Sequence, residues 1–173
     1  MEANEDNEIF KISKYKLCNF LILAKKNTYA ANAKKAKSKC ILSKNYIFSN
    51  NDFRYEDQYF GKYLDVGNEI VWYKDIPVWG MGYRGGMIRK YVDLHEETFA
   101  FLRKALMSPP IDFPARGPCE LVHNDLIYLN NYKGDILSFV GEEIILKNQT
   151  KVYFRNYIGG LIFDKTSNNV WGL

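Results

Sequence analysis

Two glutamates begin similar stretches of the sequence, and aromatic residues surround each of them at β-strand spacing. Glu69 begins E-I-V-W-Y and Glu143 begins E-I-I-L-K. Because side chains alternate between the two faces of a strand, we expect both glutamates to share one sheet face with aromatic residues of neighbouring strands. Those residues are Tyr55, Tyr59, Trp79, Tyr83, Tyr128, Tyr132, Tyr153 and Tyr157. A carboxylate among aromatic rings suits a cationic or flat aromatic ligand.

This pattern predicts an amphipathic pocket on the helix-free face of the sheet, with Ile70, Trp72, Ile144 and Leu146 facing the helices. Tyrosines that simply cover an exposed sheet are the alternative, since their amphipathic rings serve either purpose. A further alternative is an enzyme acting on a small molecule or nucleotide, with Glu69 and Glu143 as acid and base.

Recognised catalytic and metal-binding motifs are absent from the sequence. There are two histidines, His95 and His123, and three scattered cysteines, with no spacing typical of a zinc site, a P-loop or a hydrolase nucleophile. We therefore assign no catalytic residue, metal or cofactor. A non-enzymatic role is favoured, although active sites can assemble from distant residues.

Positive charge is concentrated in one segment. The net charge is +4, yet residues 25–51 hold seven lysines and no acidic residue. Such a segment can neutralise phosphates, which leaves a nucleic-acid or protein adaptor open as a function. A solvated loop is the interpretation we prefer. The lysines are Lys25, Lys26, Lys34, Lys35, Lys37, Lys39 and Lys44.

Helix and strand signals alternate along the chain. Ser13 can cap a helix over Tyr15–Lys26, and Asp93 with Glu96 predicts the start of a second helix that Pro109-Pro110 ends. Residues 30–51 are typical of a long loop. Strands are predicted at Phe53–Phe60, Glu69–Tyr73, Val78–Tyr83, Leu126–Tyr132, Gly141–Leu146 and Val152–Tyr157.

The two halves of the chain resemble each other. Residues 66–88 and 140–162 align without gaps and are identical at nine of 23 positions, including both glutamates and a Gly-Gly pair. We predict one α+β domain over residues 1–173, built from two α-β-β-β repeats at about 14–88 and 93–162. These would form a six-stranded antiparallel sheet, flat or curled towards a barrel, with two helices on one face.

Several motifs resemble an uncharacterised bacterial and archaeal domain family. They are A-K-K-N-T-Y-A from Ala24, G-x-E-I-V-W from Gly67, P-V-W-x-M-x-Y from Pro77, F-L-x-x-A-L from Phe101, R-G-P from Arg116 and V-Y-x-x-x-Y-x-G-G from Val152. Members of that family stand alone or follow XRE-type helix-turn-helix domains. The resemblance implies a sensor-type regulatory domain with a DNA-binding regulator as partner.

The N-terminal residues carry no targeting pattern. Residues 1–8 are polar and acidic, and the longest apolar run, Phe20–Ala24, is too short to span a bilayer. With unpaired cysteines as well, we expect a cytoplasmic protein with no membrane partner that binds a small amphipathic or cationic ligand.

Overall fold

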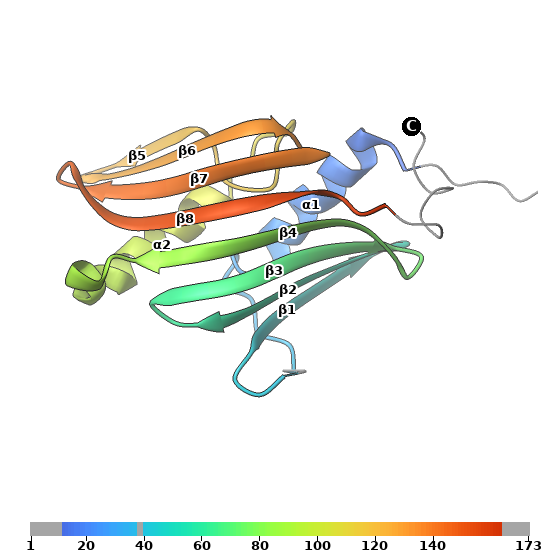
Figure 1. Ribbon diagram of the computed structural model, residues 1–173, viewed down its shortest axis with the longest axis horizontal. Helices are drawn as coiled ribbons and strands as arrows, with labels where there is room; N and C mark the ends of the chain where they lie inside the picture. Colours follow the sequence, from blue (N-terminus) through green and yellow to red (C-terminus); the bar gives the residue numbers. More distant parts are fainter. Residues whose placement is uncertain (1–11, 38–39, 164–173) are drawn as a thin grey trace, which may run out of the picture.

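The computed structural model describes residues 12–37 and 40–163 as one antiparallel sheet of eight strands with two α-helices (Figure 1). Along the chain the elements are α1 (Lys14–Asn27), β1 (Lys44–Asn50), β2 (Phe53–Gly61), β3 (Leu64–Tyr73), β4 (Ile76–Met87), the 3-10 helix η1 (Arg89–Leu94), α2 (His95–Leu106), β5 (Glu120–His123), β6 (Leu126–Asp135), β7 (Ser138–Lys147) and β8 (Thr150–Leu161). The α+β class predicted from the sequence is confirmed.

Strand order places the two halves of the chain side by side. The order is β1-β2-β3-β4-β8-β7-β6-β5, so β4 and β8 pair at the centre and each half runs outward to its own edge. Tyr83 of β4 lies opposite Tyr157 of β8. Each half therefore consists of a helix followed by four antiparallel strands, and the internal repeat itself remains a prediction.

Both helices cover the same face of the sheet (Figure 1). Leu17, Leu21 and Ala24 of α1 are fully buried against the first half, and Leu102 and Ala105 of α2 are buried against the second. Ser13 caps α1 as predicted, since its side chain accepts a hydrogen bond from the backbone N–H of Lys16. Among the described residues, no helix combines the length and apolar character needed to cross a membrane.

The prediction of six strands is wrong. The two additional strands, β1 and β5, are the edge strands of the sheet. Strand β1 lies within residues 30–51, which we predicted to be a loop, and β5 is only four residues long. Edge strands are short and polar because one side of each meets solvent, so their sequences resemble loops.

The predicted assignment of sheet faces is also wrong. Glu69, Val71, Glu143 and Ile145 are at most 2 % exposed and lie on the face that the helices cover. Residues that we expected beneath the helices, such as Trp72, are half-buried on the opposite face. Trp72 stacks there against Arg54, whose guanidinium carbon is 3.9 Å from the ring centroid. Strands with apolar residues on both faces do not identify the buried face by alternation alone.

Two local predictions, the cap of the second helix and the ends of two strands, are wrong. Asp93 does not cap α2, because η1 precedes the helix and Leu94 occupies the cap position without a side-chain hydrogen bond. The strands predicted to end at Tyr83 and Tyr157 continue through the Gly-Gly pairs: Gly85-Gly86 lies inside β4 and Gly159-Gly160 inside β8. Gly86 has φ of +144° and Gly160 has φ of +152°, so these glycines bend continuous strands.

Candidate functional site

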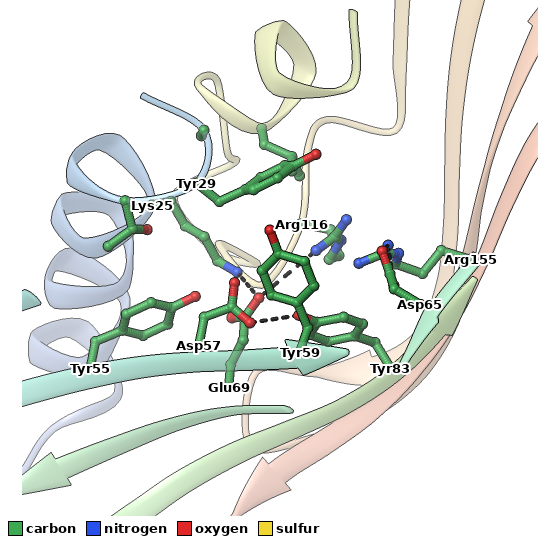
Figure 2. Close-up of a pocket in the computed structure, with 13 residues that line it drawn as sticks. Lys25, Tyr29, Tyr55, Asp57, Tyr59, Asp65, Glu69, Tyr83, Arg116 and Arg155 are labelled. Atoms are coloured by element: carbon green, nitrogen blue, oxygen red, sulfur yellow. Dashed lines mark hydrogen bonds and ion pairs between the residues drawn. The ribbon is translucent and has the colours of Figure 1, made fainter. Parts of the chain in front are cut away.

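A cleft opens on the helix-covered face of the first half, between the C-terminal ends of both helices and strands β2 to β4 (Figure 2). The free space within it amounts to about 30 Å³, enough for about two water molecules. Charged and tyrosine side chains dominate its wall. The lining residues are Lys25, Thr28, Tyr29, Ala30, Tyr55, Asp57, Tyr59, Asp65, Glu69, Tyr83, Leu106, Arg116 and Arg155.

Glu69 is neutralised from above by two cations. Nζ of Lys25, on α1, donates hydrogen bonds to both carboxylate oxygens and lies 2.5 Å from Oε1. Arg116, from the loop between α2 and β5, places a guanidinium nitrogen 3.9 Å from the same Oε1. Burial lowers the pKa of Lys25, and the negative charge of Glu69 opposes that shift.

Glu143 occupies a second, closed centre. Arg116 donates through Nε at 3.0 Å and also through a terminal nitrogen, so the pair is bidentate. The hydroxyls of Tyr128 and Tyr153 donate to the same carboxylate at 2.7 and 3.0 Å. Burial raises the pKa of this fully enclosed carboxyl, but Arg116, together with Arg155 and Tyr128, outweighs burial and holds the pKa below its usual value. Arg116 thus links the two glutamates.

Arg155 extends the network across the centre of the sheet. It projects from β8, and one terminal nitrogen donates to both oxygens of Asp65 on β3, at 2.6 and 2.8 Å. The two residues flank Gly85 in register. An added Cβ at Gly85 would lie 2.4 Å from the Arg155 Cα, so the glycine permits this close crossing.

Asp57 lies next to Glu69 but has a different partner. These residues are directly opposite each other on β2 and β3. The Tyr83 hydroxyl donates to Asp57 Oδ1 at 2.6 Å. Its ring crosses β3 over Gly67, where a Cβ would lie 2.6 Å from the hydroxyl. Burial, followed by the charge of Glu69, raises the pKa of Asp57 from 3.8 to about 7.

Equivalent positions of the two halves explain why Asp57 differs. In the second half the cross-strand row runs Asn130, Glu143, Arg155, and in the first half it runs Asp57, Glu69, Met81. The first half thus has one more carboxylate and lacks the arginine. Asn130 accepts a hydrogen bond from the Tyr157 hydroxyl at 2.5 Å, as Asp57 does from Tyr83.

The buried network holds more acid than base. Its cations are Lys25, Arg116 and Arg155, and its carboxylates are Asp57, Asp65, Glu69 and Glu143. When all seven are ionised the formal charge is −1. Asp57 is the carboxylate in this set without an ion pair to one of the three cations. The unbalanced charge is therefore located at Asp57, in the wall of the cleft.

The structure separates the predicted pocket residues into three groups. Glu69, Tyr55, Tyr59 and Tyr83 line the cleft. Glu143, Tyr128 and Tyr153 form the closed centre described above, with Tyr157 bonded to Asn130 beside it. Of the remaining two, Trp79 is fully buried in the core and donates to the Ile136 carbonyl, and the half-buried Tyr132 packs at the edge of the core, where it stacks on Phe113 with ring centroids 3.7 Å apart.

The lysine segment is not one continuous surface. Lys25 is 5 % exposed and belongs to the cleft, so it is not available to phosphates. Lys26, Lys34, Lys35 and Lys37 are exposed, and Lys44 in β1 is half-buried. Lys39 lies outside the described residues. Nucleic-acid binding through the exposed lysines remains a prediction.

Sequence reasoning missed Asp57, Asp65, Asn130 and Arg155, and it did not place Arg116 among the site residues. The gapless alignment of residues 66–88 with 140–162 already matches Met81 with Arg155, whereas the equivalence of Asp57 and Asn130 follows from strand register. Among the described residues, no group of His, Cys, Asp or Glu side chains is arranged to hold a metal ion.

Comparison with known families gives a match over residues 57–162 to DUF5680, a domain of unknown function. The chain belongs to this family. The matched region contains Asp57, Glu69, Arg116 and Arg155, but α1, and with it Lys25, precedes it. Neither the curated proteins nor the solved structures gave a match.

Proposed function

We propose that this DUF5680 chain is a small-molecule-binding domain that receives the cationic head group of its ligand at Asp57. The observation that carries the proposal is the carboxylate of Asp57, which lies in the wall of the cleft and forms no ion pair with Lys25, Arg116 or Arg155. An ammonium or guanidinium group placed there would bring the formal charge of the network from −1 to zero. It would also gain a charge-assisted hydrogen bond, which is stronger than a neutral one.

Aromatic rings around Asp57 favour the same ligand class. Tyr59 and Tyr83 line the cleft with Asp57, and Tyr29 contributes a third ring from the segment that follows α1 (Figure 2). Tyrosine faces attract cations. The small free volume favours a compact head group, with the rest of the ligand towards the mouth of the cleft.

The proposal predicts that ligand affinity depends on pH. A cation at Asp57 requires the ionised carboxylate, so binding must displace the proton that this residue holds below pH 7. Affinity for a permanently charged amine should rise about tenfold for each pH unit up to about 7 and should level off above it.

The test is calorimetric titration with ethylammonium, putrescine, agmatine and guanidinium, after a thermal-shift screen. We expect at least one of these cations to bind, and Asp57→Asn to abolish its binding. Asp75→Asn is the matched control, because it removes a carboxylate from an exposed turn. Lack of binding by every cation at pH 8, or equal binding to the Asp57→Asn variant, would contradict the proposal.

Acid–base catalysis is a second candidate function. Its original form, with Glu69 and Glu143 as the pair, is weakened because each glutamate is engaged by a buried cation. Asp57 suits the role better, since a group with a pKa near the working pH transfers protons most effectively. Turnover of a bound amine that Asp57→Asn abolishes, with binding retained, would favour this candidate over simple binding.

A regulatory role extends the first proposal. The resemblance to domains attached to helix-turn-helix regulators supports a sensor that acts through a DNA-binding partner. A DNA-binding regulator that co-purifies with this chain, and whose association with the chain changes when the amine is added, would support the sensor role. Ligand binding without any such partner would limit the function to binding.

A further inference from the structure

The guanidinium of Arg155 has a buried donor with no hydrogen-bond partner among the described residues. Arg155 is 7 % exposed and lines the cleft. The donor is its Nε. An oxygen of Glu143 lies 3.9 Å from this nitrogen, which is beyond hydrogen-bonding distance. Leaving a buried charged donor unsatisfied costs free energy, so an acceptor from a ligand would stabilise this position.

Arg116, the other guanidinium in the cleft wall, is more fully occupied. It makes a bidentate pair with Glu143 and a longer contact with Glu69. Arg155 uses one terminal nitrogen for Asp65. Of the two arginines, Arg155 therefore retains the donor capacity for an anionic group.

Asp57 and Arg155 both contact the same tyrosine, Asp57 at its hydroxyl and Arg155 over the face of its ring. The Tyr83 hydroxyl donates to Asp57 at 2.6 Å, and the Arg155 guanidinium carbon lies 4.5 Å from the centroid of the Tyr83 ring. A carboxylate that can bind a cation and a guanidinium that can bind an anion thus lie against one tyrosine in the wall of one cleft (Figure 2).

We infer that the ligand is a zwitterion, with its ammonium group at Asp57 and its carboxylate at the Nε of Arg155, as in a free α-amino acid. The inference rests on the proposed function, because it takes the cation subsite at Asp57 as given. Both head groups of an α-amino acid are small and adjacent, which matches the restricted free space. A zwitterion leaves the formal charge of the network at −1, but it supplies a cation to Asp57 and an acceptor to the Nε of Arg155.

The test compares ligands on the unaltered full chain. Calorimetric titration at pH 8 uses the common free α-amino acids, the α-carboxamide of each, which lacks the negative charge, and the N-acetyl derivative, which lacks the positive charge. We expect at least one amino acid to bind, and its two derivatives to bind about tenfold more weakly or worse, the usual weight of a charge-assisted hydrogen bond.

The outcomes distinguish the inference from the function on which it rests. A carboxamide that binds as tightly as its parent amino acid, or an amine that binds where no amino acid does, overturns the zwitterion and leaves the cation subsite standing. Absence of binding by amino acids and simple cations alike overturns both.

A variant locates the anion subsite. Arg155→Lys keeps the positive charge but removes the Nε–H, so the preference for an amino acid over its carboxamide should fall towards one. Arg84→Lys, at an exposed position on β4, should keep the preference. A preference unchanged in Arg155→Lys would contradict the placement at Arg155. If Arg155→Lys melts before it can be titrated, the ligand series on the unaltered chain decides.

Discussion

Replacing Asp57 with asparagine should stabilise the protein and at the same time remove its proposed ligand. The exchange deletes one buried negative charge with almost no change in shape. Asn130 shows that asparagine is compatible with this backbone position, since it occupies the equivalent place in the second half. There it accepts from Tyr157 and donates to the Gly117 carbonyl at 3.0 Å. Asp57 is then a residue whose presence lowers stability and serves function.

The size of the effect follows from the pKa. In the unfolded chain Asp57 has its ordinary value of 3.8, and in the folded protein its pKa is about 7. The folded state therefore binds more protons between these two values, and stability falls as pH rises through that window. Each pKa unit corresponds to about 1.4 kcal/mol, so ionisation of Asp57 removes about 4 kcal/mol in all. Above pH 7 the loss is complete.

Urea denaturation of the wild type and of Asp57→Asn from pH 4 to pH 8.5 measures this difference. We expect the difference in free energy of unfolding, variant minus wild type, to increase by about 1.4 kcal/mol for each pH unit up to about pH 7. Above pH 7 the difference should stay constant. In thermal melts each kcal/mol corresponds to about 2–4 °C for a chain of this size. Asp75→Asn should change the free energy by less than about 0.5 kcal/mol.

A difference that is independent of pH would refute the reasoning, because it would show that Asp57 titrates alike in the folded and unfolded states. A variant less stable than the wild type at pH 8 would refute it as well. That result would mean that the ionised carboxylate makes a stabilising contact greater than the cost of its burial.

Two further predictions use neighbouring residues as controls. Lys25→Met should lower the free energy of unfolding by about 3–5 kcal/mol, because it leaves Glu69 buried without its lysine. Lys26→Met, at the exposed adjacent position, should have little effect. Equal effects of the two substitutions in urea denaturation would refute the buried Lys25–Glu69 pair. Glu143→Gln should lower the free energy of unfolding by about as much, because it leaves a buried guanidinium without its carboxylate. Glu142→Gln, on the exposed face, should melt like the wild type. A melting temperature of Glu143→Gln within about 2 °C of the wild type would count against a closed ion network.

The elements that the sequence predicted correctly are those with strong local signals. The amphipathic stripe Leu17–Ala24 with Ser13 before it gave α1, and aromatic and β-branched runs gave the six inner strands. Burial enforces these patterns, because a helix stripe or a strand face that packs on a core must be apolar along its length. Edge strands β1 and β5 escaped prediction because solvent relaxes that requirement.

The candidate site was only half predictable. Glu69 and its tyrosines were found because strand alternation places them on one face, and the carboxylate is a conspicuous exception among apolar neighbours. Asp57 was missed because its neighbours Arg54, Glu56 and Gln58 are also polar, so the local pattern does not single it out. Its importance depends on standing opposite Glu69, which is a matter of register between strands.

The sequence by itself determined the alternation of elements, the resemblance of the two halves and the presence of two carboxylates among aromatic residues. Only the tertiary structure decided which sheet face the helices cover and which cation meets which carboxylate. Lys25, Arg116 and Arg155 come from a helix, a loop and a strand far apart along the chain, and each reaches its partner only once the sheet is assembled. Charge pairing depends on distances of a few ångströms in space, and sequence separation carries no information about those distances.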